Sequence, residues 1–495
     1  MSSDRMHLAR QVCSSQPFIL AVVIFALFCE TFLYSFLVPI LSYMIEHRLQ
    51  IDPSQTQNIT TALLSLHGFA TLVFAPVIAH FADKYPTRKL PFLISLAGCL
   101  VGTLLLSLTP SLPALFIGRL IQGIAGAASW IVGSATLTDH VKLENLGKVY
   151  ALSMSFVSAG VVAGPVVAGA VLELAGYWTA WSIPLGLLLL DIIMRSVMIE
   201  TPKAPSTTTK SSSPTPTPSG EPSEASALLQ HTCNQPNNMN MNMNTIDPDY
   251  EPWHDIGPEQ DPDPSPEPGF YETMLTDSRV LVGLANTVLT SALLASFDTT
   301  LTLHLRDTFG WGSLAAGIMF LSLQLPFIIL APLTGWVRDR AGLRYPTAVG
   351  WALLAPVMWL IGVPASRMVF APESAVNTES MFISAVVVFG VVVPFVRGAG
   401  SLQVSLVLNE LEMKDPRRFG EHGGSNRAFG LQDTALSTGL TIGPLISGSL
   451  TDAAGYYWSS CALAILCLLS ALASVFFLAP KPLTRGDGEG DGADV

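Results

Sequence analysis

The stretch SFVSAGVVAGPVVAGA, residues 155–170, reads as part of a long apolar helix and yet holds three glycines and a proline. Glycine and proline are the residue types that most disfavour a helix in water. A similar stretch, STGLTIGPLISGSL, follows at residues 437–450. Five positions match at a constant spacing of 279 residues: Gly160, Gly164, Pro165, Gly169 and Gly176 match Gly439, Gly443, Pro444, Gly448 and Gly455. Chance similarity of apolar sequence does not preserve such a set, so the repeat indicates two related halves.

The composition is that of a membrane protein. Of the 495 residues, 50% are hydrophobic and only 13% are charged, whereas about one-quarter of the residues are charged in ordinary soluble domains. A membrane-spanning helix needs about 20 mostly apolar residues. The sequence predicts twelve such segments, at 17–45, 58–81, 91–109, 113–137, 147–172, 177–199, 278–303, 312–336, 346–365, 379–408, 425–450 and 455–479.

The distribution of basic residues predicts the orientation. Most of the 25 basic residues lie in the N-terminus, in the connections after even-numbered segments, or in the C-terminal tail. By the positive-inside rule, both termini are then cytoplasmic. Residues 200–277 are rich in Pro, Ser, Thr, Asn and acidic side chains, and such a segment cannot bury enough apolar surface to fold alone. The predicted organisation is a cytoplasmic N-terminus (1–16), a six-helix bundle (17–199), a disordered cytoplasmic linker (200–277), a second six-helix bundle (278–479) and an acidic cytoplasmic tail (480–495).

A second repeat lies in the connections after the second and eighth segments, FAPVIAHFADKYPTRKLP and LAPLTGWVRDRAGLRYP. Four positions recur 256 residues later: Ala75, Pro76, Asp83 and Arg88 match Ala331, Pro332, Asp339 and Arg344. Charged pairs at these helix ends would latch the two halves in one state. The alternative is that the charges only anchor the helix ends on the cytoplasmic side.

A repeat of six plus six helices around a cytoplasmic linker resembles the major facilitator superfamily, and the resemblance covers nearly the whole chain apart from the termini and the linker. It implies an all-α fold of twelve transmembrane helices in two pseudo-symmetric six-helix bundles, which rock about a site near the bilayer midplane. The second loop copy fits the family's loop motif at Gly335, Asp339, Arg340, Gly342 and Arg344. The first copy departs from it, with Ala79 and Pro86 at the two glycine positions.

The fourth segment carries the family signature Arg-x-x-Gln-Gly as Arg119, Gln122 and Gly123. A cation inside a membrane span costs about 2.5–3.5 kcal/mol on insertion scales, so it normally faces the protein interior. We therefore expect Arg119 and Gln122 to face the transport pathway or a coupling carboxylate. The alternative is an arginine that snorkels to the external surface.

The Gly-Pro stretch of the fifth segment resembles the signature of the drug:proton antiporter branch of the family. Its glycines follow a four-residue spacing and would let another helix backbone approach closely. Pro165 removes one backbone hydrogen bond and is expected to bend the helix. The alternative is generic small-residue packing.

Three carboxylates lie inside predicted spans: Glu30, with Tyr34 one turn further on, Asp298, and Asp433. Their positions resemble those of carboxylates in vesicular amine transporters and their fungal relatives, although the amine transporters usually have Asp where this chain has Glu30. A buried carboxylate can carry a proton, because burial disfavours its charged form, or it can pair with a cationic substrate. The alternative for each is a structural ion pair, for instance with Arg119 or Arg397.

These features predict a proton-coupled antiporter that exports a small organic molecule such as a drug, toxin, amine or secondary metabolite, with cationic character as one option. We expect a monomer in the lipid bilayer, in the plasma membrane rather than a vacuolar or vesicular membrane. The proton gradient replaces any cofactor, and no enzyme activity or nucleic-acid partner is expected. The alternatives are a proton-coupled uptake permease of the same fold and a membrane sensor that binds a ligand without moving it.

Other motifs carry less information. No phosphate-binding loop of the G-x-x-x-x-G-K-[ST] type occurs in the sequence, which argues against an ATP-driven pump. The six cysteines have no metal-ligand spacing, so no metal site is predicted. Asn58 begins a formal glycosylation motif, NIT, on the predicted external side.

Overall fold

Long helices make up almost all of the described chain. The computed structural model describes residues 11, 13–82, 89–108, 111–141, 143–199, 269–365, 375–415 and 425–478, and these residues contain no strand. The first half comprises α2 (Gln16–Tyr43), α3 (Thr56–Ala82), α4 (Lys89–Leu108), α5 (Leu112–His140), α6 (Leu143–Ala175) and α7 (Tyr177–Val197). The second half comprises α9 (Ser278–Phe309), α10 (Ser313–Ala341), α11 (Arg344–Gly362), α12 (Ala375–Val392), η5 (Val393–Phe395), α13 (Ala399–Lys414), α14 (Ser425–Ala454) and α15 (Tyr456–Phe477). Short elements complete it: η1 (Met44–Arg48), η2 (Pro53–Gln55), α8 (Phe270–Thr276) and η4 (Val363–Ala365).

The helices correspond to the twelve predicted membrane segments. Within the described ranges, eleven helical segments are long and apolar enough to cross a membrane, and α12, η5 and α13 together form one of them, Thr378–Lys414. The twelfth is α14, which has 30 residues but a more polar sequence. Because α14 packs between α3 and α9, it lies largely against protein rather than lipid, which accounts for its serines and threonines.

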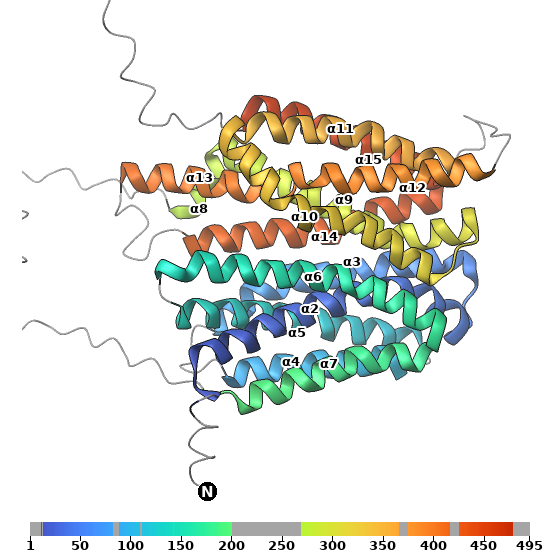
Figure 1. Cartoon of the computed structure of the whole chain (residues 1–495), viewed down its shortest axis with the longest axis horizontal. Helices are drawn as coiled ribbons and strands as arrows, with labels where there is room; N and C mark the ends of the chain where they lie inside the picture. The colour runs from blue at the N-terminus through green and yellow to red at the C-terminus, as the bar shows by residue number, and fades with distance from the viewer. Residues whose placement is uncertain are drawn as a thin grey trace, which may run out of the picture. The chain divides into compact units, whose positions relative to one another are not determined.

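Two groups of helices lie side by side in Figure 1, with α2–α7 in the lower half of the view and α9–α15 in the upper half. The principal contacts between the halves are made by α3 with α14 and by α6 with α10. The first pair joins the second and eleventh predicted segments, and the second pair joins the fifth and eighth. Because the second segment corresponds to the eighth and the fifth to the eleventh, the two contacts are equivalent under exchange of the halves. This is the expected pseudo-symmetry of the fold.

We name the two ends of the helices by the predicted orientation. The external end contains the connection between α2 and α3, and the cytoplasmic end contains the start of α2 and the end of α13. In Figure 1 the external end lies to the right.

The repeated glycines pack each half internally. A Cβ at Gly160 would lie 2.6 Å from the Phe28 carbonyl oxygen on α2. A Cβ at Gly164 would lie 2.8 Å from the Phe32 carbonyl oxygen on the same helix. At Gly443, a Cβ would lie 2.7 Å from Cα of Ala292 on α9. The matched glycines of α6 and α14 therefore allow the same close backbone approach in each half, while both helices continue through their prolines.

Gly164→Ala tests this packing. The added methyl meets backbone atoms of α2 that cannot move independently, and overpacking of this kind costs about 1–3 kcal/mol. We expect a lower thermal midpoint for the purified protein, measured by size-exclusion chromatography after heating. Gly186→Ala is the matched control, since a Cβ at this helical glycine of α7 has open space around it. Equal stability of the two variants would contradict the packing role.

Candidate functional site

Tyr34 lies between a charged group of each half, Arg119 of the first and Asp298 of the second. Its hydroxyl lies 3.3 Å from the Oδ2 atom of Asp298 on α9 and donates a hydrogen bond to it. The ring centroid lies 5.1 Å from that of His67 on α3, and the Arg119 guanidinium of α5 lies 5.3 Å from it. We call Tyr34, His67, Arg119 and Asp298, together with Glu30, the central group.

Arg119 is fully buried, which agrees with the predicted interior position and not with a snorkelling side chain. Its Nη1 atom donates to the Oε1 atom of Gln122 at 2.6 Å, and Gln122 donates in turn to the Thr103 hydroxyl at 3.2 Å. The Nε and Nη2 atoms of Arg119 have no hydrogen-bond partner in the described part of the chain. A buried cation with unused donors favours an anionic partner, and Glu30 and Asp298 both lie within range of its charge.

Glu30 lies against the small-residue face of α5. A Cβ at Gly126 would lie 2.6 Å from the carboxyl carbon of Glu30, so only glycine leaves room for this carboxylate. Its Oε2 atom lies 3.5 Å from the Cys99 thiol. A Cβ at Gly123, one turn earlier, would lie 3.2 Å from the carbonyl oxygen of His67. The last glycine of the Arg-x-x-Gln-Gly signature and Gly126 thus lie against two members of the central group.

The second half supplies its own arginine. Arg397, which follows η5, donates to the Oε1 atom of Gln324 at 3.2 Å and lies over the Phe327 ring at 4.2 Å. Asp298 therefore lies within range of the charges of both Arg119 and Arg397. Arg397 follows Arg119 by 278 residues, one less than the spacing of the glycine repeat. This spacing is the signal in the sequence that points to the position of Arg397. The positions of His67 and Gln324 can be recognised only from the fold.

Asp433 stands apart from the central group. It lies two turns from the start of α14, in the cytoplasmic half of the helix. Among the described residues, no hydrogen bond or ion pair to Asp433 occurs. The three predicted carboxylates are therefore spread along the membrane normal, with Asp433 on the cytoplasmic side of Glu30 and Asp298.

The predicted charged latch is only partly within the described structure. Asp83, Arg88 and the side chain of Asp339 lie outside the described residues. Arg340 lies over the Trp336 ring at 4.1 Å and Arg344 over the Tyr345 ring at 5.9 Å. A latch between the halves therefore remains a prediction.

Arg338, which the sequence analysis did not identify as a site residue, forms three hydrogen bonds within the second half. It donates to the carbonyl oxygens of Pro394, Phe395 and Arg397 at 3.2, 2.8 and 3.0 Å. It thereby ties the cytoplasmic end of α10 to the segment that carries Arg397.

The external ends of the two halves are joined by polar contacts. Glu46 accepts hydrogen bonds from Thr56 at 2.8 Å and from Arg306 of the second half, with which it forms an ion pair. Near α10, the Glu173 carboxylate accepts from the Leu314 backbone N–H at 2.9 Å, and so caps this helix from the other half. These contacts close the external end.

Asn58 adds a further contact at the external end. Its Nδ2 atom donates to Asp452 Oδ2 at 3.1 Å. A glycan on Asn58 would require this contact between the halves to open. Glycosylation of Asn58 stays a prediction.

At the cytoplasmic ends, no hydrogen bond or ion pair of this kind joins two described residues of different halves. With both partners in the described ranges, every hydrogen bond or ion pair between the halves lies near the midplane or at the external end. On the cytoplasmic halves of α3 and α10, the side chains of Val77, Ile329 and Trp336 are 47%, 65% and 51% exposed. Among the described residues, the contacts between the halves thus close the external end, which is the arrangement that an inward-facing state requires.

Two related helical halves, with charged side chains between them and one closed end, define a secondary transporter of the membrane. The chain belongs to the major facilitator superfamily, because the family model described as Major Facilitator Superfamily matches residues 23–411. It is a multi-pass membrane transporter of this family.

Relatives of known sequence or structure agree. The chain is similar to an uncharacterised MFS-type transporter of Schizosaccharomyces pombe, with 29% identity over 465 residues, 92% of this chain and 95% of that protein. A shorter similarity, 34% identity over 108 residues, links 22% of this chain to 27% of the class G tetracycline resistance protein of Vibrio anguillarum. The fold is similar to that of a bacterial homologue of the human lysosomal transporter Spinster in an inward-facing, unoccupied conformation, with a TM-score of 0.61, 11% identity, and coverage of 93% and 97%.

Reversing a charge at the external end tests the closure. Glu46→Arg places like charges at positions 46 and 306, so the external end should open more often. We expect Thr61→Cys, at a position that is 5% exposed and packed against Gly448, to react about tenfold faster with an impermeant thiol reagent added outside.

The double exchange Glu46→Arg with Arg306→Glu should restore slow reaction at position 61. Thr179→Cys, at an exposed external position of α7, is the control whose rate should not change. An unchanged rate at position 61 in the Glu46→Arg protein would show that this ion pair does not hold the end closed.

Proposed function

We propose that this transporter is a proton-coupled antiporter that exports small organic molecules, and that Glu30 and Asp298 exchange protons for a cationic substrate. The carrying observation is the position of both carboxylates beside the buried, incompletely hydrogen-bonded Arg119 between the halves. The similarity of part of the chain to a tetracycline resistance protein supports export of an organic compound.

The Tyr34 hydroxyl gives Asp298 a partner in either protonation state. A hydroxyl donates to an ionised carboxylate and accepts from a protonated one, so the contact at 3.3 Å is compatible with both. An ionised Asp298 attracts a cation from the cytoplasm. A proton arriving from the external side neutralises Asp298 and releases the cation. The protonated protein then returns to the inward-facing state, loses the proton to the cytoplasm, and so regenerates the ionised carboxylate.

The proton gradient supplies the free energy for this cycle. Moving one proton down the membrane potential yields about 2.3 kcal/mol per 100 mV. No other cofactor is needed. We further propose that the protein acts as a monomer in the plasma membrane with both termini in the cytoplasm, as the basic residues predict.

Transport in oriented vesicles tests the direction. Inside-out vesicles with an acidic interior are supplied with radiolabelled tetracycline or tetraphenylphosphonium, and both uptake and the change of internal pH are followed. Accumulation coupled to proton release supports export. Filling of right-side-out vesicles alone would instead identify an uptake permease, and binding without accumulation would identify a sensor.

Glu30→Gln tests the coupling assignment. The amide has the same shape but cannot release a proton, so we expect proton-driven accumulation to fall by about a hundredfold, within the usual range for loss of a proton-transfer group. The exposed carboxylate of α8 provides the matched control Glu272→Gln, which should transport normally. Proton-driven flux that survives Glu30→Gln would overturn the assignment of Glu30.

A further inference from the structure

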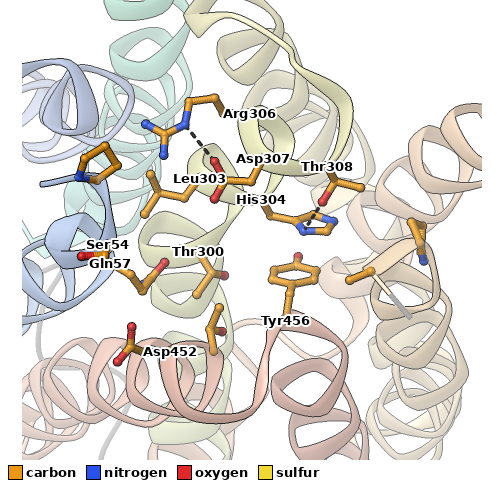
Figure 2. A pocket seen from close by; sticks show the side chains of 14 residues that line it. Ser54, Gln57, Thr300, Leu303, His304, Arg306, Asp307, Thr308, Asp452 and Tyr456 are labelled. Atoms are coloured by element: carbon orange, nitrogen blue, oxygen red, sulfur yellow. Dashed lines mark hydrogen bonds and ion pairs between the residues drawn. The ribbon is translucent and has the colours of Figure 1, made fainter. Parts of the chain in front are cut away.

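A cavity lies at the external end, and no residue of the central group lines it. Its volume is about 550 Å³, within the range of about 300–1,000 Å³ typical of small-molecule sites. Figure 2 shows side chains from both halves around it. Its lining includes Ser54, Gln57, His304, Asp307, Asp452 and Tyr456.

The charged groups of this external cavity favour a cation. Arg306 is its one described basic residue, and the guanidinium is already paired with Glu46 and, at 2.9 Å, with Asp307. Asp452 has only the neutral amide of Asn58 as a hydrogen-bond partner among described residues. Carboxylates therefore outnumber the available positive charge, and their field attracts a positively charged ligand.

Two buried polar atoms in the wall have unused hydrogen-bonding capacity. The His304 ring is 6% exposed and stacks on Tyr456, with ring centroids 3.7 Å apart and an interplanar angle of 6°. Its Nδ1 atom lies 3.1 Å from the Thr308 hydroxyl, but its Nε2 atom has no partner in the described chain. The Thr451 hydroxyl is likewise unpartnered among these residues.

Buried polar atoms are almost always hydrogen-bonded, so these two atoms point to a ligand with a polar group of its own. The tautomer of His304 decides whether Nε2 donates or accepts. A ligand hydroxyl can do either. A ligand hydroxyl can therefore form a hydrogen bond with the Nε2 atom in either tautomer, and with the Thr451 hydroxyl. A ligand group that only donates or only accepts could pair with Nε2 in one tautomer alone.

We propose that the external cavity binds a small organic cation that carries a hydroxyl group. The positive charge faces Asp452 and Asp307, and the hydroxyl faces the His304 side of the cavity. This site is separate from the carboxylates of the central group, so it does not depend on the proposed proton exchange.

Binding in this cavity has a conformational consequence. Ser54 and Gln57 belong to the first half, whereas His304, Asp307 and Asp452 belong to the second. The walls come together where contacts such as that of Asn58 with Asp452 close the external end. A ligand that bridges them stabilises the inward-facing state, because it binds that state preferentially. An external cation would thus slow the cycle by delaying opening to the outside.

Choline is a suitable probe because it combines a quaternary ammonium with a hydroxyl. Binding of radiolabelled choline to the purified full-length chain is measured by equilibrium dialysis. The protein carries Glu30→Gln and Asp298→Asn, which remove the central carboxylates. We expect unlabelled choline to compete about tenfold better than 3,3-dimethylbutan-1-ol, its uncharged isostere, and about threefold better than ethyltrimethylammonium, which lacks the hydroxyl.

Variants in the same background locate the bound choline. Asp452→Asn should weaken binding about tenfold, and His304→Phe, which keeps an aromatic ring beside Tyr456, about threefold. Glu272→Gln is the matched control with unchanged binding, since it removes an exposed carboxylate of α8 that does not line the cavity. Failure of choline to bind, equal binding of the uncharged isostere, or unchanged binding in the Asp452→Asn protein would overturn the proposal.

A protection measurement covers the case in which the Asp452 variant does not fold. With Asp452 and His304 intact, choline should slow the reaction of Ser54→Cys with an impermeant thiol reagent from the external side. It should not slow the reaction of Thr179→Cys, which lies at the external end of α7 outside the cavity. Absence of protection at position 54 would contradict binding in this cavity.

Discussion

The burial of Arg119 is the constraint on which the arrangement of the central group depends. A guanidinium removed from water inside a membrane protein needs anionic or hydrogen-bonding neighbours, and Gln122 satisfies only one of its three nitrogens. The Tyr34 face and the carboxylates of Glu30 and Asp298 are the neighbours that the fold brings within range. Because Asp298 belongs to the other half, the environment of this one cation changes whenever the halves move.

The glycines of α6 serve two different contacts along one helix. Gly160 and Gly164 bring α6 onto α2 within the first half, whereas Gly169 lies against the Ser313 backbone at the start of α10 in the second half. The second copy repeats this division, since Gly443 packs on α9 and Gly448 meets Thr61 of α3. Each copy of the glycine repeat therefore makes one close contact inside its own half and one contact with the other half at the external end. The second contact has to separate if the external end opens.

The overall fold could be predicted from the sequence because it depends on local composition and on repetition. Apolar segments of sufficient length predicted the helices, and the two repeats related the halves. The more polar helix α14 was among the twelve predicted segments, and its Gly-Pro pattern matches that of α6, although it is not one of the eleven segments that are apolar enough to cross a membrane by composition.

The central group was predictable only in part. The residue types of Glu30, Arg119 and Asp298 marked them as interior groups, but the sequence does not show how the two halves pack together. This packing brings the Tyr34 hydroxyl to 3.3 Å from Asp298. His67 and Gln324 are ordinary polar residues of helices in the sequence, and their positions beside the charges follow only from the packing.

If Glu30 and Asp298 exchange protons for the substrate as proposed, their protonation also controls which end of the transporter is open. Spin labels at Ser196 and Met413, exposed positions on α7 and α13 near the cytoplasmic end, report the opening through their distance in lipid nanodiscs. We expect this distance to change between acidic and alkaline pH in the otherwise unaltered protein, and to stay the same when Glu30→Gln and Asp298→Asn are both present. The same pH-dependent change in both proteins would contradict it.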